Sequence, residues 1–157
     1  MTDTVDTVSA ITNHHAELQA ALATRVEAVI GAARADAPYL ASVAALRRLL
    51  EHDIVPHALA EEEVLYAAAT APTLIPLVTG MVFEHQTLLA LAADLAAAPT
   101  GVDAAAAAAA IRAVFIGHVR RENELLLPAL ATDPAIDLPA LLPRMHEQMT
   151  AHQAVDS

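Results

Sequence analysis

The sequence predicts an all-α protein, an up-down-up-down four-helix bundle with a short fifth helix at its C-terminal end. Composition is the first reason, because 56% of the 157 residues are hydrophobic but only 3% are aromatic. Most of the apolar residues are Ala (39) and Leu (21), which have high helix propensity. Second, no segment shows the alternation of apolar and polar residues that a half-buried strand requires. Third, proline-containing breaks separate long segments with helical periodicity.

The breaks give the order and approximate length of the helices. They contain Pro38, Pro72, Pro99 and Pro134. Because the connections are short, neighbouring helices are expected to run antiparallel in a bundle over about residues 4–131. The chain has the usual size of one domain, so residues 1–157 are expected to form a single domain. The helices are expected over residues 4–34, 39–70, 74–97 and 103–131, followed by an amphipathic helix over 138–154.

Pro56 lies inside the second expected helix. A proline there removes the backbone hydrogen bond to the carbonyl of His52, at a cost of about 3 kcal/mol. The apolar stripe before Pro56 nevertheless continues in phase through His57 and Glu61. We therefore expect one kinked helix rather than two separate helices.

The charge balance argues against nucleic acid and anionic membranes as partners. The formal net charge is −11, and all eight basic residues are Arg. Eight basic residues in so acidic a chain are too few to neutralise a run of phosphates. One uncharged stretch of membrane length, residues 64–83, is interrupted by Pro72 and Pro76 and is expected to form a helix, a turn and a helix rather than a span.

Cysteine is absent from the chain. This excludes disulfides, thiolate nucleophiles, iron–sulfur clusters and cysteine-based zinc sites. Any bound metal must be held by His and carboxylate side chains. The first residues carry acid where a signal peptide carries base, and no apolar stretch follows them, so a cytoplasmic location is expected. The Gly and Ser residues form neither a phosphate-binding loop nor a nucleophile motif.

Four of the eight His residues lie where a helical core stripe should carry Leu or Val. In the first helix, His15 fills a gap in the stripe that contains Ile11 and Leu18. Two of the four are followed by a Glu four residues later, on the same helical face. The inward set is His15, His57, Glu61, His85, His118 and Glu122. The other four His residues, His14, His52, His146 and His152, are expected to face solvent, and a fifth His ligand from among them is the alternative.

The inward His and Glu residues are expected to meet in one layer of the bundle. In antiparallel helices, residues equidistant from a connecting turn lie at the same level, and the four His residues match in depth to within a few ångströms. Two buried carboxylates require a compensating positive charge, which a metal ion supplies. Imidazole nitrogen and carboxylate oxygen suit Fe, Mn or Zn. Flanking Glu62, Glu63 and Glu124 are expected to be solvated, with Glu62 a candidate to support a metal ligand.

The order His, His-x-x-x-Glu, His, His-x-x-x-Glu over four helices resembles the hemerythrin-like family, the HHE cation-binding domain. The resemblance covers about residues 10–131, and the segments that begin at His57 and His118 look like copies of one another. It implies a non-haem di-iron centre with imidazoles as terminal ligands. Glu61 and Glu122 would bridge the two irons. The choice of iron is implied by the resemblance, since the ligand types alone also fit Mn or Zn.

The chain departs from the oxygen-carrying hemerythrins at one ligand. The third helix of those proteins offers two His residues one turn apart, whereas His85 is flanked by Met81 and Leu89. Their fourth helix uses a carboxylate five residues beyond its His, where this chain has Asn123. The resemblance therefore favours a site with an open position for peroxide, oxygen or nitric oxide over a reversible oxygen carrier. Its surroundings are expected to be apolar, with no titratable group beside the open position, and Tyr66 belongs to no motif.

The expected function is that of a di-iron protein that handles or senses O2, peroxide or nitric oxide. Weak peroxide-decomposing or nitric-oxide-related turnover is left open, and no catalytic side chain is assigned. Two alternatives remain: an iron- or oxygen-responsive binding module without turnover, and a structural helical bundle without metal. The sequence identifies no protein partner. The C-terminal helix, which carries Met145 and Met149, is expected to pack across the bundle, and a partner-binding helix is the alternative.

Overall fold

The first and last predicted helices are found close to their expected bounds in the computed structural model, which describes residues 3–155. Helix α1 spans Thr4–Arg34 and helix α7 spans Leu138–Val155. No β-strand occurs within the described residues, so the all-α prediction is confirmed. Between α1 and α7, the chain forms α2 (Leu40–Leu49), η1 (Leu50–Ile54), α3 (Val55–Ala60), η2 (Glu61–Tyr66), α4 (Ile75–Ala97), α5 (Gly101–Arg121), η3 (Glu122–Leu126) and α6 (Leu127–Thr132), where η denotes a π-helical segment.

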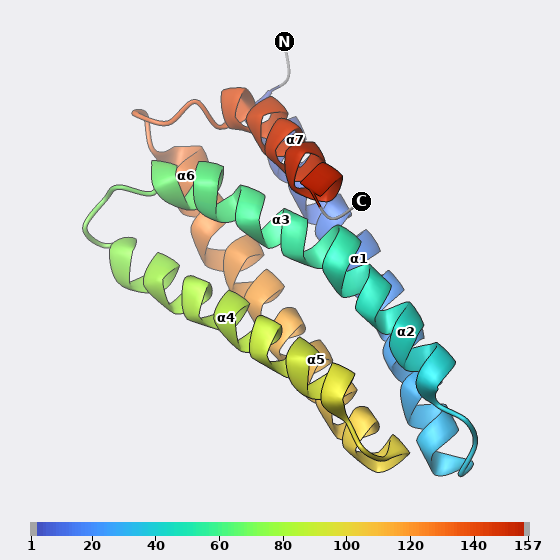
Figure 1. Ribbon diagram of the computed structural model, residues 1–157. Helices are drawn as coiled ribbons and strands as arrows, with labels where there is room; N and C mark the ends of the chain where they lie inside the picture. Colours follow the sequence, from blue (N-terminus) through green and yellow to red (C-terminus); the bar gives the residue numbers. More distant parts are fainter. Residues whose placement is uncertain (1–2, 156–157) are drawn as a thin grey trace.

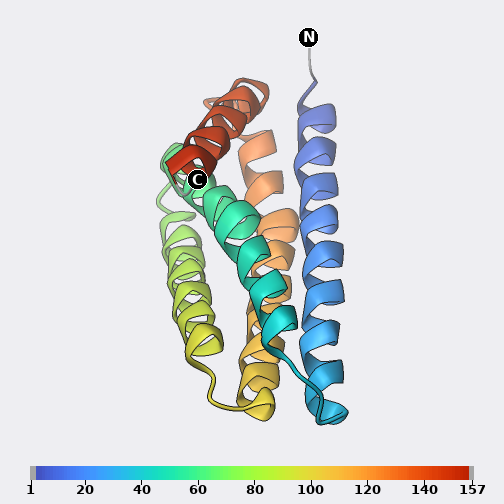
Figure 2. The ribbon, with the colours of Figure 1, turned by 45° about the vertical axis from the view of Figure 1, so that its right-hand side comes forward.

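These elements join into four long helical segments that lie side by side (Figure 1). The first is α1, the second runs from α2 through η2, the third is α4, and the fourth runs from α5 through α6. Figure 2 shows that each segment runs opposite to the one before it and that the connections lie at the two ends. Helix α7 lies obliquely across one end, where it packs against α3, η2 and α1.

The buried apolar side chains form two clusters with the predicted polar residues between them. Along α1, for example, Ile11 belongs to one cluster, Leu18 belongs to the other, and His15 lies between them. On α4, Met81 and Leu88 flank His85 in the same way. Each of the four long segments thus crosses an apolar layer, a polar layer and a second apolar layer. This arrangement holds the polar layer away from both ends of the molecule.

The second segment continues through Pro56 without a break, as predicted. The backbone dihedrals of Ile54 (φ −75°, ψ −46°) and Val55 (φ −66°, ψ −48°) are helical, and the π-helical η1 ends just before the proline. The carbonyl of His52, which Pro56 leaves without its usual donor, accepts a hydrogen bond of 2.9 Å from the side-chain amide of Gln153 in α7. The C-terminal helix is therefore attached at the point where the proline interrupts the backbone hydrogen bonds.

Two helical stretches are long and apolar enough to cross a membrane by length and composition alone. They are Ile75–Ala97 and Gly101–Thr132, with mean hydropathies of 1.3 and 1.5. In this fold the inner faces of these stretches carry the buried polar residues His85, His118 and Glu122. Both stretches thus contribute to the protein core.

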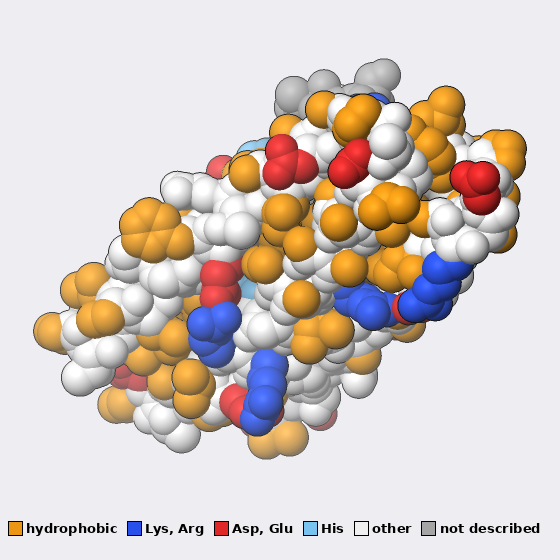
Figure 3. Space-filling view, turned by 90° about the horizontal axis from the view of Figure 1, so that it is seen from below, with side chains coloured by type: hydrophobic (Ala, Val, Ile, Leu, Met, Phe, Trp, Pro, Cys, Tyr) orange, Lys and Arg blue, Asp and Glu red, His pale blue; other side chains and the backbone are white. Residues whose placement is uncertain are grey.

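The surface mixes apolar side chains with short-range ion pairs. On the face shown in Figure 3, Arg side chains lie next to acidic ones among apolar patches. Ion pairs of the described residues include Arg47 with Glu51, at 2.8 Å, and Arg120 with Glu124, at 2.9 Å. Exposed pairs of this kind contribute little to stability.

Candidate metal centre

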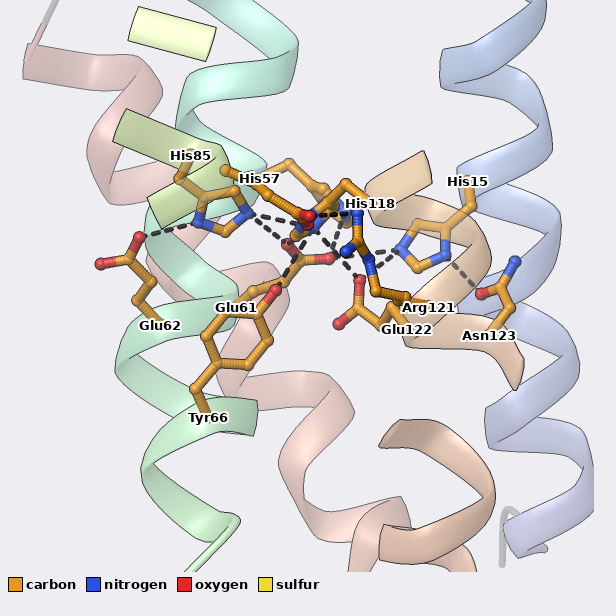
Figure 4. Close-up of polar contacts among 11 residues, drawn as sticks. His15, His57, Glu61, Glu62, Tyr66, His85, His118, Arg121, Glu122 and Asn123 are labelled. Atoms are coloured by element: carbon orange, nitrogen blue, oxygen red, sulfur yellow. Dashed lines mark hydrogen bonds and ion pairs between the residues drawn. The ribbon is translucent and has the colours of Figure 1, made fainter. Parts of the chain in front are cut away.

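All six residues predicted to point inward meet in one buried layer, and each is at most 5% exposed. Figure 4 shows their side chains directed toward one another from four helical segments. Glu61 and Glu122 hold equivalent places, because each is the first residue of a π-helical segment. Wide π turns occur frequently at functional sites. The six come from α1 (His15), α3 (His57), η2 (Glu61), α4 (His85), α5 (His118) and η3 (Glu122).

Glu61 lies at the centre of the layer, and its two oxygens face different pairs of imidazoles. Oε1 lies 2.6 Å from Nε2 of His57 and 3.2 Å from Nε2 of His15. Oε2 lies 3.5 Å from Nε2 of His85 and 3.8 Å from Nε2 of His118. The potential ligand atoms within each group lie within 4.8 Å of one another. The result is two adjoining groups of metal-ligating side chains that share one carboxylate.

Glu122 also lies between the two groups. Its Oε2 is 3.5 Å from Nε2 of His15 in one group and 3.8 Å from Nε2 of His118 in the other. Within the described part of the chain, neither oxygen of Glu122 has a hydrogen-bond partner, and Oε2 of Glu61 has none either. Buried carboxylate oxygens without partners are costly. A cation between the two carboxylates would supply the missing interactions, so the residues present fit a metal site.

The two carboxyl groups differ in their protonation when no metal is bound. Burial raises the pKa of Glu122, and the negative charge of Glu61 raises it further. Burial acts in the same direction on Glu61, but the charge of His57 and the nearby imidazoles of His118 and His15 outweigh it and hold the pKa of Glu61 well below its usual range. The surroundings in the metal-free protein therefore favour the ionised form of Glu61 and the protonated form of Glu122.

The carboxylate of Glu61 makes two of the imidazoles hold their protons more tightly. Burial lowers the pKa of His15, but the hydrogen bond to Glu61 and its negative charge outweigh burial, so the net shift is upward. The pKa of His85 is raised for the same reason. Protons on these rings supply part of the positive charge that a metal ion would otherwise provide.

Three of the four imidazoles are oriented by a second hydrogen bond on the far side of the ring. In each case Nδ1 donates to a side-chain oxygen, and Nε2 is left facing the centre of the layer. Such outer partners fix the tautomer and ring orientation of metal ligands. The pairs are His15 with Asn123 (2.7 Å), His85 with Glu62 (2.7 Å) and His118 with Glu84 (3.0 Å).

The sequence pattern suggests only one of these outer partners, Glu62. Asn123 and Glu84 are not predicted. All three partners serve a ligand on a different helix, and spacing along one helix does not reveal such a contact. The sequence does contain one feature that could have identified these partners: each of the three is the immediate neighbour of a proposed ligand in the chain. Glu84 is held in turn by an ion pair with Arg121.

Tyr66 also belongs to the site. Its hydroxyl donates to Nε2 of His118 at 3.3 Å, and its ring stacks on His85 with centroids 5.7 Å apart. Burial, together with Glu61 and Glu122, raises the pKa of the phenol, which keeps its proton. The expectation of a purely apolar surrounding therefore overlooked Tyr66, a titratable group that contacts two of the inward imidazoles. The π-helical hydrogen bonding of η2 pairs residues five apart, which brings Tyr66 onto the same side as Glu61.

The other four His residues are placed as expected with one exception. His52 and His146 are exposed, and His152 is partly exposed beside Glu63, at 3.1 Å. The exception is His14, whose Nε2 is buried and has no partner. Its ring centroid lies 4.9 Å from that of His57, so His14 borders the site rather than facing solvent.

A largely apolar cavity of about 130 Å³ reaches the edge of the site between α3 and α4. Glu62 and His85 form its polar part, and Leu89 lies at its rim with 50% of its surface exposed. Of the two apolar residues that flank His85 in the sequence, Met81 is buried, whereas Leu89 is not. A small uncharged molecule would therefore find an apolar space beside one of the imidazoles.

Comparison with known proteins gives one match. The family model described as the hemerythrin HHE cation binding domain matches residues 6–130. The matched region contains all six inward residues and extends from α1 into α6, so α7 lies beyond it. Searches of curated proteins and of solved structures found no match.

Proposed function

Because the chain belongs to the hemerythrin HHE cation-binding domain family, we propose that it is a non-haem di-iron protein that handles or senses O2, peroxide or nitric oxide. The sharing of Glu61 between two groups of metal-ligating side chains is the observation that carries this proposal. A single mononuclear site would not need one carboxylate with each oxygen directed at a different pair of imidazoles. The antiparallel course of the long segments supports an up-down-up-down four-helix bundle as the scaffold.

The two groups divide the proposed ligands. His15 and His57 would hold one ion, His85 and His118 would hold the other, and Glu61 would bridge them. Glu122 is the second proposed bridge, because its Oε2 faces one imidazole from each group. The donor set suits Fe, Mn or Zn, and family membership favours iron. Bound iron would supply Lewis acidity and one-electron redox chemistry.

The chain's own residues contribute orientation, screening and a hydrogen-bond donor. Asn123, Glu62 and Glu84 hold three imidazoles in position, and the apolar layers on both sides exclude bulk water. The protonated phenol of Tyr66 is directed into the layer beside His118. A small anionic or polar ligand bound between the imidazoles would accept a hydrogen bond from this hydroxyl. Four imidazoles and two carboxylates leave ligand positions open for such a molecule, which supports small-molecule handling.

The test is metal content after anaerobic reconstitution with ferrous iron. The unaltered protein is expected to retain two irons per chain, and Glu61→Ala is expected to lose both, since that side chain serves both groups. Glu63→Ala is the matched control, because Glu63 lies two residues away and its side chain is 46% exposed. One iron or none in the unaltered protein would contradict the di-iron proposal. Peroxide consumption and nitric oxide reduction by the loaded protein would then separate turnover from sensing.

A further inference from the structure

His57 differs from the other three imidazoles of the site. Its Nε2 faces Glu61, but its Nδ1 is buried and has no hydrogen-bond partner among the described residues. The other three each have an acceptor oxygen on Nδ1. When Nε2 binds a metal, the ring proton must lie on Nδ1. A buried N–H without an acceptor is costly, and metal-binding imidazoles almost always have one.

His14 lies beside His57 and offers an acceptor with no hydrogen-bond partner among the described residues. The rings of His14 and His57 are 4.9 Å apart and meet edge to face at 63°. Nδ1 of His14 lies 3.9 Å from the exposed carboxylate of Glu17, whose negative charge favours a proton on Nδ1 over one on Nε2. Nε2 then carries the lone pair, and this atom is buried and unpartnered. The structure thus places an unsatisfied donor and an unsatisfied acceptor on adjacent rings.

A cavity of about 20 Å³ is lined by both rings. A cavity needs about 10–15 Å³ and two to four polar partners to hold one water molecule. His57, His14 and the neighbouring His146 provide polar groups in its wall. Leu142, Met145 and Met149 of α7 complete the lining.

We propose that His14 is the outer partner of His57, which it reaches through one water molecule in this cavity. His57 Nδ1 donates to the water, and the water donates to Nε2 of His14. The inference rests on the proposed metal centre. It makes His14 a positioning residue for the half of the site that contains His15 and His57, because it fixes the tautomer and orientation of His57. Helix α7 gains a role as well, since it encloses the water.

The variants for the test are His14→Ala and His14→Gln in the full-length, iron-loaded protein. Loss of an outer partner typically lowers metal affinity 10–100-fold. We expect His14→Ala to release one of its two ferrous ions to a competing chelator about 10–100-fold more readily than the unaltered protein. His14→Gln is expected to restore most of the affinity, because its amide oxygen can accept from the water. His52→Ala, an exposed position on the same helical segment as His57, is expected to behave like the unaltered protein.

A second readout follows the Nδ1 proton of His57 directly. In the diferrous protein, exchangeable imidazole protons near the iron appear as shifted resonances in the proton NMR spectrum. We expect a single such resonance to exchange faster with solvent in His14→Ala and to recover in His14→Gln. Substitution of Ala10, which also lines the cavity, by Leu would displace the water and should reproduce the effect while His14 is still present.

The outcomes separate this inference from the proposed function. If the unaltered protein holds two irons and His14→Ala changes neither chelator competition nor proton exchange, the role of His14 is wrong and the di-iron proposal stands. Equal losses in His14→Ala and His14→Gln would also overturn it, because they would indicate ring packing instead of hydrogen bonding. If the unaltered protein does not bind two irons, both proposals fail together.

Discussion

At the scale of single residues, two buried glutamates with the same ligand role have opposite electrostatic surroundings. Glu61 lies among four imidazole nitrogens, which hold its pKa low and keep it ionised. Glu122 lies between two of the same rings, but burial and the charge of Glu61 raise its pKa. In the metal-free protein, therefore, only one of the two carries charge that the protein interior must compensate.

This difference predicts unequal effects of the same substitution. Glu61→Gln removes the anion that pairs with the surrounding imidazoles, and breaking a buried pair costs about 3–5 kcal/mol. Glu122→Gln replaces a protonated carboxyl by a neutral amide of the same shape, and is expected to change the stability of the metal-free protein by less than about 1 kcal/mol. Urea unfolding of both metal-free variants at pH 7 measures the two effects. Equal destabilisation would show that both carboxyls are ionised.

Tyr66 gives a second prediction at this scale. Tyr66→Phe keeps the ring that stacks on His85 and removes only the hydroxyl. The variant is expected to retain both irons but to bind azide about fivefold more weakly, the effect of one hydrogen bond of about 1 kcal/mol. Azide titration followed by absorption, with elemental analysis alongside, tests this. Loss of an iron would instead identify the phenol oxygen as a metal ligand.

The sequence predicts all six inward residues because each continues a stripe of apolar residues at spacings of three and four. That rule assumes an α-helix of constant pitch, and it fails where the pitch changes. Tyr66 lies at the end of the π-helical η2, so its direction does not follow from the α-helical period. Asn123 and Glu84 act across the space between helices, and spacing along one helix carries no information about such contacts.

At the scale of helices, two of the three π-helical segments in the described part of the chain are followed by a proline. Pro56 follows the end of η1 by two residues, and Pro128 follows the end of η3 by two residues. In both places the wide turn precedes a proline that cannot donate a backbone hydrogen bond. The sequence indicates the prolines but not how the freed carbonyls are satisfied. For Pro56 the donor is Gln153, about one hundred residues along the chain.

The hydrogen bond between Gln153 and the carbonyl of His52 predicts energetic coupling between Gln153 and Pro56. Gln153→Ala is expected to destabilise the protein by about 1 kcal/mol. With Pro56→Ala as background the cost should fall, because the restored backbone N–H can serve the same carbonyl. A double-mutant cycle by urea unfolding gives the coupling energy. Additive effects would mean that α7 is held mainly by its other contacts.

The cavity between α3 and α4 gives another prediction for this scale. Ala58 lines the cavity, and Ala58→Phe is expected to fill it while every proposed ligand is kept. We expect the diferrous protein to bind nitric oxide about tenfold more slowly, equivalent to about 1.4 kcal/mol of added barrier, with its iron content unchanged. Stopped-flow absorption measures the rate. Ala90→Phe, on the exposed side of α4, is the matched control, and equal rates in both variants would exclude this route.

At the scale of the whole molecule, a polar layer separates two apolar clusters. The four long segments are predictable because proline-containing breaks mark the ends of the helices and short loops allow few arrangements of neighbouring helices. The oblique position of α7 is less predictable, since it depends on contacts with α3 and η2 that no periodic pattern encodes. Folding without metal thus encloses partly charged groups between two apolar layers, and the stability of the metal-free protein must depend on pH.

The direction of that dependence follows from the shifted groups. The pKa values of His15 and His85 lie above their ordinary value of 6.5, so their stabilising contribution is complete below pH 6.5 and is lost as pH rises through the raised values. The raised pKa of Glu122 makes the fold less stable as pH climbs from 4.5 toward that raised value. The lowered pKa of Glu61 keeps its contribution intact until pH falls below 4.5. His14 has a pKa lowered mainly by burial, so its contribution to stability is lost as pH falls below 6.5.

The metal-free protein is therefore expected to gain stability on acidification from about pH 8 to about pH 5.5. His15, His85 and Glu122 favour this gain, and only His14 opposes it in this pH range. The iron-loaded protein should lose stability over the same range, since protons compete with metal for the imidazoles and carboxylates. Melting temperatures of both forms, measured across this range, are expected to converge toward acid pH. Parallel decreases in the two forms would contradict the protonation states derived for the buried layer. A metal-free protein as stable as the loaded one at pH 8 would contradict the metal centre itself, because at that pH protons compete least with the metal for the imidazoles and carboxylates.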